Sequence, residues 1–113
     1  MMITGEVVED ISAAELKELL DSGEAIQLID VRDAGEFAFA RIPGAKSIPL
    51  AELPGRIGEL DPSRLTVIHC KMGGRSPKAI EILRKSGFPG QIRCLRGGIT
   101  AWSNEIDPKV PKY

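Results

Sequence analysis

The chain has 113 residues, the size of one compact domain, and we expect a single domain over residues 1–113. Its formal net charge of −1 excludes the strongly basic surface typical of proteins that bind nucleic acids or anionic membranes. No apolar run approaches the roughly 18–20 residues that a membrane span needs. The first residues lack the basic and apolar parts of a signal peptide, so we expect a cytoplasmic protein.

Two cysteines, Cys70 and Cys94, stand far apart, and neither belongs to a C-x-x-C pair. In a reducing compartment, isolated cysteines indicate thiols and not a disulfide framework. One histidine and two cysteines make a poor ligand set for zinc, so we expect no metal and no cofactor.

The first half of the chain alternates strands and helices. Ser12 and Glu15 form a capping box, which begins a helix that ends at Gly23, a residue suited to the left-handed C′ position. Residues 26–31 predict a buried strand because Ile, Leu and Val dominate the run. Four shorter elements complete this half: an edge strand at 6–8, a helix at 33–40, a strand at 47–50 and a helix from Pro54 to about Leu60.

The second half contains the clearest strand, residues 65–69, whose centre is β-branched. A helix follows at 77–86, with Ser76 as its N-cap and Pro77 at its first position. A strand at 91–95 and a helix at 99–104 complete the pattern. Alternating strands and helices predict an α/β domain, with a mostly parallel sheet of about five strands flanked by helices on both faces.

The chemically informative segment begins at Cys70, which follows the strand at 65–69 and precedes a glycine-containing loop and a helix. Open α/β sheets place ligand sites at the carboxyl ends of their strands. Loop N–H groups, the positive end of the helix and the Arg75 guanidinium should together lower the thiol pKa by about one to several units from its usual 8.5. The same groups would hold an anion against the sulfur.

A cysteine at the end of a buried strand is more often a small apolar core residue than a nucleophile. Here the strand before Cys70, the glycines after it and the Ser-Pro helix start favour the nucleophile. Cys94 lies inside an expected strand, and we interpret it as a core thiol. We interpret Trp102 as a side chain that anchors the core. His69 should point away from the Cys70 side chain, and we interpret it as a packed, hydrogen-bonded residue.

The loop Cys70-Lys71-Met72-Gly73-Gly74-Arg75-Ser76 resembles the active-site loop of rhodanese domains. Three further segments resemble motifs of that family in the same order: residues 28–32 with 36–37 after them, residues 41–45 with 48–49 after them, and residues 97–102. The resemblance covers nearly the whole chain. It differs at Ala40-Arg41, where many members have Gly-His, so no role is carried over from that histidine.

The resemblance implies a rhodanese-like sulfurtransferase in which Cys70 takes the outer sulfur of thiosulfate or of a persulfide donor and passes it on. The substrate-binding residues would be those that follow Cys70 in the loop: Lys71, Met72, Gly73, Gly74, Arg75 and Ser76. Asp30 and Arg32 resemble a supporting charged pair near the loop. Whether Lys71 attracts the donor or is simply solvated stays open.

A narrower resemblance, to the C-terminal rhodanese domain of sulfurylases, includes the segment 40–45, the Cys70 loop and the C-terminal segment 102–113. It implies a ubiquitin-like sulfur-carrier protein as acceptor and an adenylyltransferase as partner. The chain would then be either free-standing or part of a larger sulfurylase.

Two other functions stay open. Phosphatases and arsenate reductases of related shape have arginine six positions after the nucleophile, whereas Arg75 lies five positions after Cys70 and shortens the loop. A non-catalytic interaction module of the same fold would have no reason to keep both Cys70 and Arg75.

Overall fold

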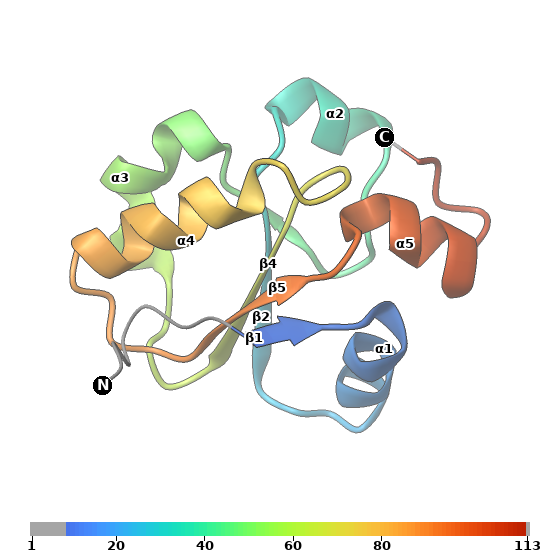
Figure 1. Ribbon diagram of the computed structural model, residues 1–113, viewed down its shortest axis with the longest axis horizontal. Helices are drawn as coiled ribbons and strands as arrows, with labels where there is room; N and C mark the ends of the chain where they lie inside the picture. Colours follow the sequence, from blue (N-terminus) through green and yellow to red (C-terminus); the bar gives the residue numbers. More distant parts are fainter. Residues whose placement is uncertain (1–8, 113) are drawn as a thin grey trace.

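The computed structural model describes residues 9–112, and in them a five-stranded parallel sheet forms the centre of the molecule (Figure 1). Every pair of neighbouring strands runs parallel, in the spatial order β1-β5-β4-β2-β3. The strands are β1 (Glu9–Ile11), β2 (Ile26–Asp30), β3 (Lys46–Ser47), β4 (Leu65–His69) and β5 (Ile92–Leu95). The expected α/β fold is confirmed.

Helices cover both faces of the sheet (Figure 1). One face carries α1 (Ala13–Asp21) and α5 (Gly98–Glu105), and the other carries α3 (Leu53–Arg56) and α4 (Ser76–Lys85). The 3-10 turns η2 (Leu50–Glu52) and η3 (Ile57–Glu59) flank α3, and α2 (Ala34–Phe39) follows β2. In the part of the chain that the structure describes, no helix is long and apolar enough to cross a membrane.

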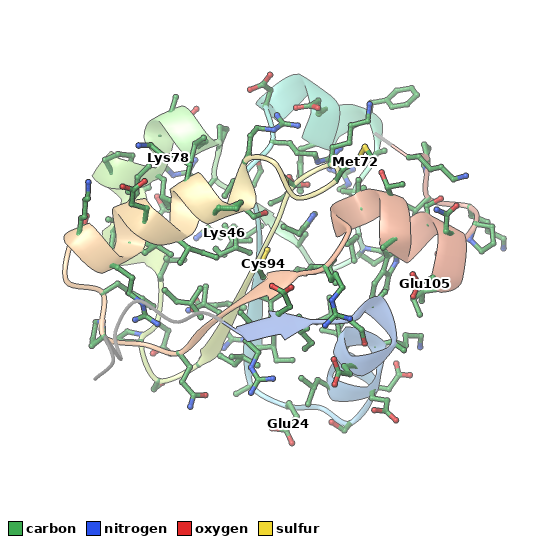
Figure 2. The ribbon with its side chains drawn as sticks, viewed as in Figure 1. Glu24, Lys46, Met72, Lys78, Cys94 and Glu105 are labelled. Atoms are coloured by element: carbon green, nitrogen blue, oxygen red, sulfur yellow. The ribbon has the colours of Figure 1, made fainter. Side chains whose placement is uncertain are left out.

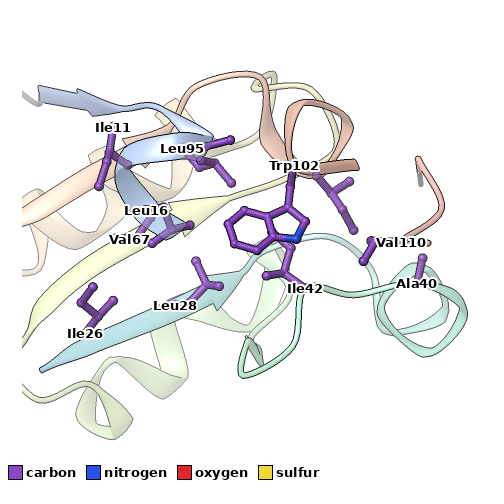
Figure 3. Packing of buried hydrophobic residues seen from close by; sticks show 12 residues of the cluster. Ile11, Leu16, Ile26, Leu28, Ala40, Ile42, Val67, Leu95, Trp102 and Val110 are labelled. Carbon is purple, nitrogen blue, oxygen red and sulfur yellow. The ribbon is translucent and has the colours of Figure 1, made fainter. Parts of the chain in front are cut away.

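The sheet separates two apolar clusters because consecutive strand residues point to opposite faces. In β4, Val67 packs on the face of α1 and α5, whereas Ile68 packs on the face of α3 and α4. Trp102 of α5 is 4% exposed and lies among the aliphatic side chains of the first cluster, beside Ile42 (Figure 3). Its interpretation as a core anchor is confirmed, and Cys70 belongs to the second cluster.

Most expected elements are present, with small changes at their ends. Gly23 closes α1 with φ of +78°, as expected for the left-handed position. The strand expected at 47–50 is wrong, since β3 contains only Lys46 and Ser47 and a 3-10 turn begins at Leu50. The N–H groups of Ile48 and Leu50 still donate to β2, but to the adjacent carbonyls of Asp30 and Val31, so the regular ladder spacing is lost as the chain turns. The edge strand expected at 6–8 lies outside the described residues, and β1 occupies that edge at Glu9–Ile11.

Candidate active site

Cys70 lies directly after β4, at the carboxyl end of a strand that pairs with β2 on one side and β5 on the other. A loop of five residues, 71–75, connects it to α4. The sequence placed Cys70 at this position, and a ligand site is expected at the carboxyl ends of such strands. Cys70 is 1% exposed, so its sulfur lies beneath the loop and not on top of it.

The loop backbone is directed at the Cys70 sulfur. The N–H of Gly73 donates to Sγ at 3.0 Å, and Gly73 has a φ of +116° that side chains rarely allow. Burial raises the pKa of the Cys70 thiol, but the Ser76 hydroxyl and the backbone N–H groups of Arg75, Ser76 and Gly73 outweigh it. The net result is a thiol pKa below its ordinary value, so a larger fraction of Cys70 is thiolate at neutral pH.

Ser76 has a different role from the one expected. It is the first residue of α4, and Arg75 is the N-cap, so the expectation that Ser76 caps the helix is wrong. Its hydroxyl is fully buried and forms no hydrogen bond of good geometry among the described residues. It nevertheless lies near enough to Cys70 and Cys94 to lower the pKa of either thiol. The hydroxyl therefore lies toward the thiols and does not cap the helix.

The N-terminus of α5 holds the start of the loop. The N–H groups of Ile99 and Thr100 donate to the carbonyl oxygens of Cys70 and Lys71, at 2.9 and 3.1 Å. The first N–H groups of a helix have no partner inside the helix, so the loop supplies acceptors that α5 needs. Gly98 allows this contact, because a Cβ there would lie 2.4 Å from the oxygen of Cys70. The sequence marked residues 97–102 as a motif without showing that they touch the Cys70 loop.

Arg75 closes the far end of the loop and pairs with Glu36, which the sequence marked as part of a motif without assigning it a role. Its guanidinium donates to both carboxylate oxygens of Glu36 on α2, at 2.7 and 3.1 Å. These hydrogen bonds lower the pKa of Glu36 to about 2 and raise that of Arg75. The two residues are 39 positions apart, and only the fold brings them together.

Asp30 and Arg32 form a buried ion pair at the end of β2. Both side chains are 0% exposed, and Arg32 Nη2 lies 2.6 Å from Asp30 Oδ2. Arg32 also donates to the carbonyl oxygen of Ala40, just after α2. Asp30 pairs across the sheet with His69, the residue before Cys70, and the N–H of Val31 donates to the His69 carbonyl. The pair therefore supports the strand end that carries Cys70.

His69 is packed as expected but not hydrogen-bonded. It is fully buried, and neither ring nitrogen has a hydrogen-bond partner among the described residues. Its Nε2 lies 3.8 Å from the Asp30 carboxylate, too far for a hydrogen bond. Burial lowers the pKa of His69 to about 4, so the ring is neutral at pH 7.

The remaining loop side chains point outward. Met72 is 67% exposed at the tip of the loop (Figure 2), Gly74 is exposed, and Lys71 is half-buried. Cys94 is half-buried on β5, packs against the second core cluster, and lines a cavity of about 600 Å³ beside α4. Burial raises the pKa of its thiol above the ordinary value, whereas the pKa of the Cys70 thiol is lowered.

No group of three or more His, Cys, Asp or Glu is placed to hold a metal ion within residues 9–112.

These features define what the site can do. A thiolate held by inward-facing N–H groups is a nucleophile whose negative charge is already stabilised. The N–H groups can also share their hydrogen bonds with an anion that approaches the sulfur. Since Cys70 is almost fully covered, the reacting end of a substrate must be slender.

Comparison with known proteins agrees with this geometry. The family model described as rhodanese-like domain matches residues 12–105. A protein named sulfurtransferase from Allochromatium vinosum is 36% identical over 104 residues, which are 92% of this chain and 96% of that protein. The structure of a thiosulfate sulfurtransferase from Pseudomonas aeruginosa superposes with a TM-score of 0.79 at 30% identity, covering 88% of this chain and 21% of that one.

One relative is much longer than this chain. The probable adenylyltransferase/sulfurtransferase MoeZ of Mycobacterium tuberculosis is 38% identical over 105 residues. That match covers 91% of this chain but only 26% of MoeZ. The chain therefore spans about a quarter of this relative's length.

Proposed function

The chain belongs to the rhodanese-like domain family, and from that premise we propose that it is a sulfurtransferase that carries a sulfur atom as a persulfide on Cys70. Relatives that bear the name sulfurtransferase support sulfur transfer at the level of the family. The observation that carries the proposal for this chain is the Cys70 sulfur, which receives the Gly73 N–H at 3.0 Å and has a lowered pKa.

In the first step, the Cys70 thiolate attacks the outer sulfur of a donor such as thiosulfate. A bond forms between the two sulfurs, the bond to the sulfite group breaks with its electron pair, and sulfite leaves. Charge balances, because one thiolate and one dianion become one persulfide anion and one dianion. The N–H groups of Gly73, Arg75 and Ser76 stabilise the thiolate before the attack and the persulfide after it.

In the second step, a nucleophilic acceptor attacks the outer sulfur of the persulfide, and the Cys70 thiolate leaves. Attack on a divalent sulfur needs no proton donor for the leaving group, since a stabilised thiolate departs as an anion. The buried, neutral His69 therefore takes no part in the chemistry.

Donor and acceptor follow from the narrower resemblance. We propose thiosulfate or the persulfide of a cysteine desulfurase as donor, and the activated C-terminal carboxylate of a ubiquitin-like sulfur-carrier protein as acceptor. With this acceptor the persulfide is the nucleophile: its outer sulfur attacks the carbonyl carbon, and the activating group leaves. Two external thiols then reduce the S–S bond, become a disulfide, and release the carrier thiocarboxylate and the Cys70 thiolate. The name of MoeZ, which joins an adenylyltransferase to a sulfurtransferase, supports a partner that activates the carrier. Lys71, Met72 and Gly74 would contact these substrates, because they form the outer part of the loop.

The rival phosphatase chemistry fits this loop less well. A phosphatase holds a tetrahedral oxyanion with two N–H groups of an arginine, and both terminal nitrogens of Arg75 already donate to Glu36. The sulfur is also almost fully covered, which suits a slender sulfur donor better than a phosphate ester.

Mass spectrometry after thiosulfate treatment tests the proposal. Wild-type protein should gain one sulfur atom, lose it again when cyanide is added, and release thiocyanate. Cys70→Ser should gain none, whereas Cys94→Ser, which removes the second thiol, should load like the wild type. No added sulfur from thiosulfate or from a cysteine desulfurase would leave the non-catalytic module as the better description. Phosphate-ester hydrolysis lost in Cys70→Ser would favour the phosphatase.

A further inference from the structure

Glu36 lies on α2, and its carboxylate is shared between two groups. Oε1 accepts the N–H of Asp33 at 2.9 Å, which closes a capping box at the start of α2. The same oxygen accepts from Arg75 Nη1 at 2.7 Å, and Oε2 accepts from Nη2 at 3.1 Å. The carboxylate is thus fixed to its own helix before it meets the guanidinium.

This ion pair is more buried than the pairs that lysine side chains form on the surface. The side chains of Arg75 and Glu36 are 34% and 26% exposed, whereas those of Lys17 and Asp21 are 45% and 60% exposed. Partial burial and a forked geometry make such a pair more persistent than a solvated one. The Arg75 fork is therefore occupied by Glu36 in the resting protein.

The loop backbone does not need this pair to keep its shape. Backbone hydrogen bonds fix the carbonyl groups of Cys70, Lys71 and Arg75, the last through the N–H of Ala79 at 3.2 Å. These contacts come from α5 and α4, and none involves α2. The ion pair therefore fixes the position of the Arg75 guanidinium and balances its positive charge.

We propose that Glu36 is a positioning residue that holds the Arg75 guanidinium in a neutral pair and so limits how strongly the Cys70 site attracts an anionic donor. Arg75 is the last residue of the five-residue loop that folds over the Cys70 sulfur, so its charge lies beside the site. Without the carboxylate, Arg75 would present an unopposed positive charge beside the thiolate. The inference rests on the proposed attack of Cys70 on an anionic sulfur donor.

The test compares two alkylating probes of similar size, anionic iodoacetate and neutral iodoacetamide, in the folded protein at low salt. The ratio of their rates at Cys70 cancels differences in access and in thiolate fraction, because both probes react with the same sulfur. Mass mapping of the modified peptide assigns the reaction to Cys70. In Glu36→Gln, the amide oxygen can still cap Asp33, but the charge is gone.

We expect the iodoacetate to iodoacetamide ratio to rise about two- to fivefold in Glu36→Gln, the effect of one unpaired charge beside the sulfur at low salt. The gain should disappear at high salt. Glu36→Asp, which keeps the charge, should stay near the wild type. The matched control is Glu59→Gln, since Glu59 also pairs with an arginine, at 2.8 Å, but on η3.

Three results would overturn the inference: an unchanged or lower ratio in Glu36→Gln, an equal gain in Glu59→Gln, or a gain that persists when Arg75→Gln is added. In the sulfur-transfer assay, the KM for thiosulfate should fall by a similar factor in Glu36→Gln without a rise in kcat. Because alkylation needs no sulfur transfer, a wild type that never loads sulfur would refute the proposed function while the alkylation ratio still reports on Glu36.

Discussion

Gly98 is where α5 approaches the Cys70 loop most closely, and we expect Gly98→Ala to disrupt both stability and sulfur transfer. A Cβ at this position would lie 2.4 Å from the oxygen of Cys70 and 2.6 Å from that of Lys71. Both atoms belong to the backbone, so no side-chain rotation relieves the clash. Gly98 also has a φ of +57°, in the left-handed region that alanine disfavours.

The loss of stability expected for Gly98→Ala has three parts. The left-handed backbone contributes about 1 kcal/mol, and overpacking against a fixed backbone about 1–3 kcal/mol. If the loop moves away, the hydrogen bonds from Ile99 and Thr100 to the loop carbonyls weaken, at about 1 kcal/mol each. We therefore expect a loss of about 4–6 kcal/mol in the free energy of unfolding, measured by urea denaturation.

Gly23→Ala is the matched control. Gly23 has a similar φ of +78°, but a Cβ there would meet nothing within 4 Å. It should therefore lose only about 1 kcal/mol and leave the rate of persulfide formation unchanged. If Gly98→Ala were as stable as Gly23→Ala and loaded sulfur at the wild-type rate, the argument that α5 fixes the loop would be refuted.

Two further predictions concern the buried charges behind the loop. The pKa of His69 is about 4 in the folded protein and 6.5 in the unfolded chain, so acid protonates this histidine in the unfolded chain first. The free energy of unfolding should therefore fall as the pH drops below 6.5, by about 2 kcal/mol at pH 5. In His69→Gln, which removes the chain's one histidine, this slope between pH 6.5 and 5 should vanish in urea titrations, and an unchanged slope would contradict the assignment. Asp30→Asn should cost about 3–5 kcal/mol, because it leaves the fully buried Arg32 without its carboxylate. Adding Arg32→Met should recover part of that loss, and a double variant less stable than Asp30→Asn would argue against an uncompensated charge as the cause.

The fold could be predicted from the sequence because its strongest signals are local. Short apolar runs such as residues 65–69 mark buried strands, and a capping box at Ser12 marks the start of α1. The position of Cys70 followed from the same signals, since a strand, a glycine-containing loop and a helix occur in order. Residues 47–50 show the limit, because their apolar side chains suggested a strand, whereas the chain turns into a 3-10 helix at Leu50.

The sequence could not predict contacts that depend on tertiary structure. Ser76 before a proline has the local pattern of an N-cap, and the residue before proline is usually extended. The fold instead makes Ser76 helical and buries its hydroxyl near the two thiols. The pairing of Arg75 with Glu36 and the contact of Gly98 with Cys70 join residues 39 and 28 positions apart, respectively. No local pattern marks either contact.

Burial raises the pKa of the Cys70 thiol and so opposes thiolate formation, but hydrogen-bond donors of the loop lower the pKa by more. A thiol that is 1% exposed would ordinarily have a raised pKa, as burial gives the half-buried Cys94. Cys70 differs because the Gly73 N–H donates to its sulfur and the N–H groups and hydroxyl at the start of α4 also lower its pKa. Losing those donors would therefore leave Cys70 less acidic than a free cysteine, not merely equal to one. In the proposed sulfur transfer, the covered sulfur should react only while the loop backbone, held by α5 and α4, keeps its shape.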